Sequence, residues 1–298
     1  MYKHSFNRAV LQVRIDTVTP LLIKAGDSGL DPTAANLACV RTRHAVRGPT
    51  VYIPGSSLKG VVRSTAEAAV RGRRYGDVDG ACDPLANSSC HKRDRDETPP
   101  AIHRRQCLAC RAFGSQLVRG RIGVRDQFPW REDGDDDANH IAANHVELRH
   151  GVAIDRVTGS VKHGPFDQEL VPAGVSFWGE VALENYQVWQ LGFLLQALDD
   201  ITAGFAQLGS SKSRGLGVAR VHVTKILHEQ PARAGDVPRG AGDIADAAAR
   251  RDYGLLQEAV LPQTRGERRG MHWRFAAADP ASVDAWSAAA RAALEALA

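Results

Sequence analysis

Apolar and polar residues alternate near the start of the chain, where polar side chains separate Leu11, Val13 and Ile15. A period of two is typical of a strand with one buried face. Apolar residues then return every three or four positions between Leu58 and Ala69, directly after a Pro-Gly-Ser-Ser turn. The pattern therefore predicts a strand, a long loop and a helix that begins at this turn.

The same two periods recur further along the chain. Residues 121–126 and 177–183 alternate as strands, residues 186–203 repeat apolar side chains at helical spacing, and residues 218–226 are rich in strand-favouring β-branched residues. The resulting order is strand, helix, strand, strand, helix, strand. It predicts an α+β protein with a ferredoxin-like (RRM-like) βαββαβ domain, in which two helices cover an antiparallel sheet.

Two long excursions interrupt this order. Residues 72–119 show no sustained period and contain four of the five cysteines. Residues 127–172 are polar, acidic and punctuated by glycine. We interpret the first excursion as an insertion, and we expect the second to have a function because a compact domain rarely keeps so long an excursion without one.

The chain changes in composition after residue 229. A proline- and glycine-rich linker is followed by two alanine-rich segments, 243–261 and 281–298, which predict helices. We therefore expect a domain over residues 1–229 and a helical extension over residues 230–298.

The cysteines of the first excursion have the spacing of a metal site. They follow the pattern Cys-x7-Cys-x16-Cys-x2-Cys and are Cys82, Cys90, Cys107 and Cys110. Two thiolates separated by two residues can bind one ion from a single turn, and a second pair completes a tetrahedron. Thiolates favour Zn²⁺ or an iron–sulfur cluster, and structural zinc suits a loop without signs of electron transfer. His91 or His103 could replace one thiol, while free thiols or a redox pair are the alternatives.

Two segments have the composition of phosphate-binding turns. Residues 54–60 join a tight turn and two hydroxyls to a helix N-terminus, whose amides and dipole favour an anion. Residues 208–217 combine hydroxyls and two cations with glycines that allow a backbone to come close. Either segment alone could be an ordinary cap or hairpin, but together they indicate contacts with a nucleic-acid backbone. The candidate residues are Ser56, Ser57, Lys59, Arg63, Ser211, Lys212, Ser213 and Arg214.

Composition adds little to this picture. The formal net charge of +4 is only a weak indication of a nucleic-acid partner. The sequence shows no signal peptide, and no apolar run approaches the roughly 20 residues needed to cross a bilayer. The clustered cysteines do not resemble a secreted disulfide framework. We expect a cytoplasmic protein without membrane contact.

These motifs together resemble the RAMP superfamily of CRISPR systems, and in particular the repeated backbone subunit of type III effector complexes. The resemblance covers most of residues 10–226 and leaves the C-terminal extension outside it. The matching stretches occur in the family's order: Tyr52–Gly60 with Arg63, Cys107–Ser115, Arg121–Asp126, Gly151–Arg156 with Thr158-Gly159, and Leu208–Gly217.

The resemblance implies that copies of the subunit stack along a CRISPR guide RNA (crRNA) with other effector subunits and position a complementary target RNA. A β-hairpin thumb would lie within residues 127–172 and displace base pairs of the guide–target duplex. Val152, Ile154 and Phe166 are its candidate wedges. The two phosphate-binding segments would hold the guide backbone.

Many members of this family also cut the target RNA with an aspartate in the loop after the first strand. Counting back from Val40-Arg41 places Asn36 where that acid is expected, and Asp31 is the nearest carboxylate, with Asp27 behind it. An amide cannot act as a charged metal ligand or a base. The resemblance thus leaves open a nuclease that uses Asp31 and Mg²⁺ or another divalent cation, or a scaffold without catalysis.

Two other functions compete with guide-RNA binding. A precursor-crRNA-processing endoribonuclease of the same superfamily would need a histidine for general acid–base cleavage beside a 2′-hydroxyl, and His44, His140 and His145 are the candidates. A metabolic enzyme on the same scaffold is disfavoured by the paired phosphate-binding segments and the cysteine excursion.

Overall fold

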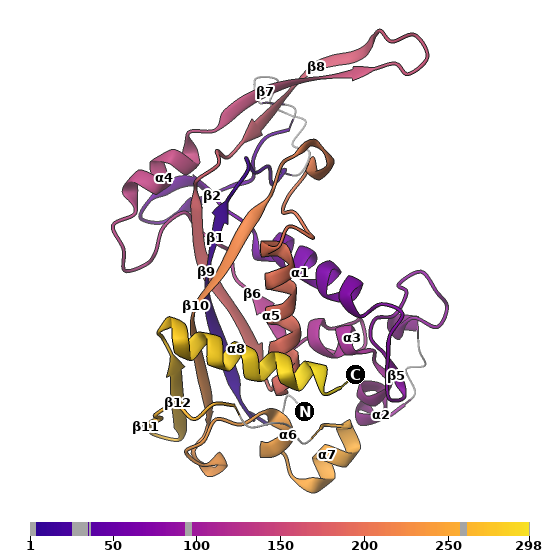
Figure 1. Ribbon diagram of the computed structural model, residues 1–298, viewed down its shortest axis with the longest axis vertical. Coiled ribbons are helices and arrows are strands. Elements are labelled where there is room, and N and C mark those ends of the chain that lie inside the picture. The colour runs from indigo at the N-terminus through magenta and orange to yellow at the C-terminus, as the bar shows by residue number, and fades with distance from the viewer. Residues whose placement is uncertain (1–3, 26–34, 36, 93–96, 257–260, 298) are drawn as a thin grey trace.

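The computed structural model describes residues 4–25, 35, 37–92, 97–256 and 261–297 (Figure 1). Its centre is a six-stranded sheet in the order β11-β12-β10-β1-β9-β6, in which all neighbouring strands are antiparallel. The strands are β1 (Arg8–Thr17), β6 (Ile122–Val124), β9 (Ser176–Glu184), β10 (Ala219–Pro231), β11 (Glu267–Arg269) and β12 (His272–Ala277). The alternation predicted for the first strand is present, because Leu11, Val13 and Ile15 are buried in β1.

Three helices pack together against this sheet: α1 (Gly55–Val70), α5 (Val188–Thr202) and α8 (Pro280–Glu295) (Figure 1). α5 lies between the other two and contributes one of the most buried apolar faces of the core. Gly192 allows α8 to cross α5 closely, since a Cβ there would come 2.0 Å from the carbonyl oxygen of Ala290. The protein is thus a mixed α+β structure with a mainly antiparallel sheet.

The first excursion folds into short elements between α1 and β6. It contains β4 (Arg74–Tyr75), β5 (Val78–Asp79), a 3-10 turn η1 (Cys90–Lys92), α2 (Pro99–Arg105) and α3 (Leu108–Phe113). α3 is tied to the central core, because Phe113 meets Phe193 of α5 edge to face at 6.0 Å. The absence of a sustained period in the sequence matches this succession of short elements.

The second excursion forms a helix and a long hairpin. α4 (Asp137–Asn144) is followed by β7 (Glu147–Ile154) and β8 (Val161–Leu170), which pair with each other and project away from the main sheet (Figure 1). A small sheet of β2 (Arg41–His44) and β3 (Gly48–Val51) contacts α4, since Asn144 Oδ1 accepts a hydrogen bond from the Val51 amide at 3.0 Å. The sequence predicted a loop where β2 lies, because its charged residues show no apolar alternation.

The C-terminal region differs from the two predicted helices. The second predicted helix is present as α8, which ends at Glu295, while the described part of the first segment forms the short helices α6 (Ala241–Ile244) and α7 (Ala247–Tyr253). Between them and α8, the charged hairpin β11–β12 extends the sheet, with β12 paired to β10 from Ile226 to Pro231. The prediction missed a short strand pattern in β12, where Trp273, Phe275 and Ala277 alternate with His272, Arg274 and Ala276, whereas the charged β11 has no such pattern.

A buried polar network lies where this extension meets the sheet. Gln230 Nε2 donates to the carbonyls of Gly235 and Val237, so Gln230 Oε1 faces His228 Nε2 at 2.9 Å and accepts its proton. His228 Nδ1 then accepts from the Tyr186 hydroxyl at 2.7 Å. Burial lowers the pKa of His228 to about 4, which keeps the imidazole neutral in the folded protein.

This network makes stability depend on pH. Unfolded chains bind a proton at His228 near pH 6.5 and the folded protein does so only near pH 4, so the stabilisation present above pH 6.5 is lost as the pH falls towards 4. The difference amounts to roughly 3 kcal/mol at about 1.4 kcal/mol per pH unit. Denaturant unfolding of His228→Asn should show a shallower dependence between pH 4.5 and 6.5. Above pH 7.5 the free energy of unfolding should depend on pH equally in the variant and the parent. If the variant kept the parent's pH dependence between pH 4.5 and 6.5, this assignment would be wrong.

Candidate metal centre and nucleic-acid interface

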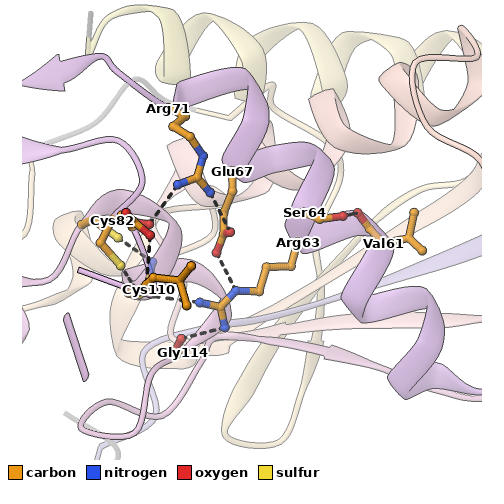
Figure 2. Close-up of polar contacts among 11 residues, drawn as sticks. Val61, Arg63, Ser64, Glu67, Arg71, Cys82, Cys110 and Gly114 are labelled. Carbon is orange, nitrogen blue, oxygen red and sulfur yellow. Dashed lines mark hydrogen bonds and ion pairs between the residues drawn. The ribbon is translucent and has the colours of Figure 1, made fainter. Parts of the chain in front are cut away.

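The four cysteines of the first excursion converge on one point. Their Sγ atoms all lie within 4.8 Å of one another, and Cys82 Sγ is 3.9 Å from Cys110 Sγ (Figure 2). A tetrahedral zinc ion with Zn–S bonds of about 2.3 Å separates its sulfurs by about 3.8 Å. The cluster therefore fits a single tetrahedral ion, and the four thiols suit a metal such as zinc.

Backbone amides already point at these sulfurs. Cys107 is the N-cap of α3, where its Sγ accepts a hydrogen bond from the Cys110 amide at 3.4 Å, and its own amide donates to Cys90 Sγ at 3.3 Å. Hydrogen bonds from Cys107 and Cys110 lower the pKa of Cys90 to about 4, against the effect of burial. The same sulfur–sulfur hydrogen bonds raise the pKa of Cys110. The cluster thus favours a thiolate at Cys90, the form that binds metal.

The two candidate histidines have other partners. His103 is buried, and its Nδ1 lies 3.0 Å from the carbonyl oxygen of Tyr253 in α7. His91 Nε2 lies 3.5 Å from Ser89 Oγ. Within the described part of the chain, the group with metal-binding geometry consists of the four cysteines.

A groove of about 410 Å³ lies between the start of α1 and the loop 208–217. It joins the two candidate phosphate-binding segments, which are about 150 residues apart in the chain. Its polar lining residues are Lys24, Ser56, Ser57, Ser64, Ser210 and Lys212.

The start of α1 presents free donors to this groove. The N-cap residue is Pro54, whose own side chain makes no capping hydrogen bond. The Gly55 amide donates to Asp126 Oδ1 at 2.8 Å, which fixes the turn. The amides of the first turn have no partner within the helix, and Ser56 and Ser57 are exposed beside them. Amides at the positive end of a helix dipole suit an anionic oxygen.

The loop on the other side is held rigidly to the segment after β1. Ser210 N donates to Leu22 O at 2.7 Å, and Gly217 N donates to Pro20 O at 3.0 Å. Gly217 has φ +82°, and a Cβ there would come 1.9 Å from the Leu208 carbonyl oxygen. A glycine is therefore required here, and Lys212 is presented from a defined backbone.

The predicted binding residues separate into three groups. Ser56, Ser57 and Lys212 line the groove, whereas Ser211, Ser213 and Arg214 belong to the same loop but not to the lining. Lys59 is half-buried on α1, where burial and then the neighbouring Arg63 lower its pKa. Arg63 turns away to Glu67 and the cysteine cluster (Figure 2). The additional lining residues are Lys24, Ser64 and Ser210, and Lys24 lies outside any motif that the sequence offers.

The hairpin β7–β8 carries the candidate wedges. Val152 and Ile154 are 49% and 62% exposed. Phe166 is half-buried against Gly151, where a Cβ would come 2.6 Å from its ring. Phe166 thus packs within the hairpin. The candidate acids Asp27 and Asp31, and Asn36, lie outside the described residues.

Two of the three candidate histidines meet at one aromatic ring. The rings of His44 and His140 each lie 5.0 Å from the ring of Trp130, and the guanidinium of Arg47 lies 5.1 Å from it. Burial, and then Arg47, lower the pKa of His140. His145 lies beyond this cluster, as the C-cap of α4.

Comparison with known proteins identifies the family of this chain. No curated protein matches the chain. Among the described residues, none of the helices is both long and apolar enough to cross a membrane. A family model, the RAMP superfamily, matches residues 14–220, a span that includes the cysteine cluster, the groove and the β7–β8 hairpin. Since the match covers more than half of its length, the chain belongs to the RAMP superfamily.

Proposed function

We propose that this protein is a guide-RNA-binding backbone subunit of a type III-like CRISPR effector complex. Membership of the RAMP superfamily suggests CRISPR-associated RNA binding. The observation that carries the proposal is the groove, because it brings two distant phosphate-binding segments to one surface. The guide backbone would pass between the amides and hydroxyls of Ser56 and Ser57 on one side and Lys212 on the other, with Lys24 nearby.

The β7–β8 hairpin would act as the thumb. Its exposed Val152 and Ile154 would displace a base pair of the guide–target duplex, while Phe166 would support the hairpin from within. Copies of the chain would stack along the crRNA, with further effector subunits at the ends. The partners are therefore crRNA, target RNA and other copies of the same chain.

The scaffold for this function would be a ferredoxin-like domain over residues 1–229. The chain order β1, α1, β6, β9, α5, β10 and the sheet order β10-β1-β9-β6 support this assignment, because the fourth strand lies beside the first and the third lies between the first and second. We assign residues 72–119 to a zinc-binding insertion, residues 127–172 to the thumb region, and residues 230–298 to a C-terminal extension. Four protein ligands would leave zinc no open position, so its role would be structural.

RNA carried by the purified protein tests the proposal. A guide-binding subunit expressed with its repeat array should retain RNA of guide length that shares a repeat-derived end, since phosphate contacts hold guides of any spacer sequence. Copurified RNA that lacks this shared end would reject guide-RNA binding. So would a parent that retains no more RNA than the variant with Lys24→Ala and Lys212→Ala.

Target cleavage by this subunit would require an acid in the loop after β1. Asp31, with Asp27 second, would bind Mg²⁺ beside the displaced target nucleotide and stabilise the charge that develops on the phosphate. Assembled particles should then cut labelled complementary RNA at regular spacing, and Asp31→Ala should abolish the cuts. Bound but uncut target in the parent would instead identify a scaffold that depends on a separate nuclease.

A second candidate function is processing of precursor crRNA. The observation that favours it is the meeting of His44 and His140 at Trp130, because two imidazoles near one ring could serve as acid and base. Incubating the parent and His44→Ala with repeat RNA in EDTA separates the candidates. Metal-independent cleavage lost in the variant would support processing, and an intact repeat would leave guide binding as the function.

A further inference from the structure

A second set of charges lies on α1, away from the groove. Glu67 is placed between two arginines: Arg63 Nε is 2.7 Å from Glu67 Oε1, and Arg71 NH2 is 3.3 Å from Glu67 Oε2 (Figure 2). The three residues follow one another at intervals of four, so they lie along one side of the helix. The Glu67 side chain is only 17% exposed, whereas Arg63 and Arg71 are 35% and 46% exposed, so the carboxylate is the most buried of the three groups.

Both arginines reach beyond Glu67 to the cysteine cluster. Arg63 NH2 lies 3.7 Å from Cys110 Sγ, and Arg63 NH1 donates to the carbonyl of Gly114 at 3.1 Å. Arg71 NH1 donates to the carbonyl of Cys82 at 3.1 Å. Arg71 therefore contacts the first of the four cysteines and Arg63 contacts the last (Figure 2).

Charge explains why a guanidinium is placed there. A zinc ion bound by four thiolates carries a net charge of about −2, and a buried charge of this size is costly unless donors or opposite charges offset it. The amides of Cys107 and Cys110 supply two donors. Arg63 supplies a positive charge from a half-buried position, and Glu67 fixes the orientation of its planar donor group.

We infer that Arg63 is a positioning residue of the metal centre, which donates to the Cys110 thiolate and balances the charge of the cluster, and that it does not contact RNA. Glu67 orients Arg63, and Arg71 holds the loop that carries Cys82. This inference rests on the metal site proposed above. It replaces the role in phosphate binding that the sequence suggests for Arg63.

Helix α1 then connects the metal centre with the groove. Arg63 stands seven residues after Ser56, a distance of about 10 Å along a helix. Because the helix is rigid, a loaded metal centre holds the first turn of α1 in place beside the loop 208–217. Arg63 would therefore influence RNA only through the metal.

Zinc affinity of matched variants tests this role. Competition with a chromophoric chelator should show that Arg63→Gln lowers the zinc association constant about 10- to 100-fold, the effect usual for partners of metal ligands. Arg63→Lys keeps the charge but not the planar donor group, so it should retain part of the affinity. Arg73→Gln removes an exposed arginine that follows α1 and should bind zinc like the parent.

The RNA affinity of the same variants distinguishes the two roles of Arg63. With zinc saturating, Arg63→Gln should keep the parent's salt dependence of RNA binding. Parental zinc affinity in Arg63→Gln would overturn the inference, as would a salt slope lowered by about 0.7, the value of one phosphate contact on a single strand. If Arg63→Gln does not fold, Arg63→Lys takes its place, and full parental zinc affinity in that variant would also overturn the inference. A parent without zinc would instead refute the metal site itself.

Discussion

Replacing both Cys107 and Cys110 by serine should abolish zinc binding and unfold the protein at 37 °C. Binding energy of a structural zinc is folding energy, on the order of 10 kcal/mol in small zinc domains, whereas whole proteins are stable by only about 5–15 kcal/mol. The loss would not stay local, because Cys90, Cys107 and Phe113 belong to the same buried core as α5 and the sheet. Elemental analysis and thermal unfolding with and without a chelator measure both effects.

The fifth cysteine provides the matched control. Cys39 is buried away from the cluster, and its Sγ donates to the carbonyl of Glu169 at 3.2 Å. Burial, and then the charge of Glu169, raise the pKa of Cys39 to about 12, so it remains a thiol. Cys39→Ser keeps a donor at this site and should keep the full zinc content. About one zinc per chain is expected in both the parent and this control, and a parent without zinc, or a double variant that melts like the parent, would contradict the metal centre.

Removing the two cations of the groove should weaken RNA binding for all sequences alike. Each lost phosphate contact on a single strand lowers the salt slope by about 0.7, so Lys24→Ala with Lys212→Ala should lower it by about 1.4. Near 0.1 M salt the same relation gives a loss of affinity of about 25-fold. Fluorescence anisotropy with two unrelated RNAs over a range of salt concentrations measures both numbers.

Two exposed arginines of the C-terminal region serve as the control for this measurement. Arg233→Ala with Arg265→Ala removes the same charge at exposed positions that lie outside the groove lining, Arg233 being separated from loop 208–217 by the whole of β10, and should leave the salt slope unchanged. An equal loss in the control would show a general effect of net charge. A loss confined to one of the two RNAs would show base recognition, and either result would argue against the groove as the backbone-binding surface.

The elements that could be predicted from the sequence are those with a period of their own. β1, β9 and β10 alternate, and α1 and α5 repeat apolar residues at helical spacing, so local pattern and tertiary packing agree. The cysteine cluster could be predicted because a Cys-x2-Cys pair is close in space whatever surrounds it. β11 could not, because its three charged residues have no pattern of their own and pair with β12. β12 has a short alternation of Trp273, Phe275 and Ala277 that the prediction missed.

Side-chain direction is the part that the sequence does not determine. Arg63 lies one turn from Lys59 and has the chemistry of a phosphate contact, but Glu67 and the cysteine loop compete for its guanidinium and hold it. Lys24 is a lone cation whose position in the groove depends on how the segment after β1 folds against loop 208–217. Phe166 is similar, because only the hairpin register places Gly151 opposite its ring. These roles follow from contacts between residues far apart in sequence.

The close crossing at Gly192 and the pairing of β12 with β10 have a practical consequence for shortened forms of the chain. A fragment that ends at residue 229 would strip α8 from α5 and leave a broad apolar stripe facing water. It would also turn β10 into an edge strand with a row of unpaired amides and carbonyls, a ready template for a strand from another molecule. Such a fragment should self-associate through this edge, and particles assembled from it would be held together by contacts foreign to the native protein.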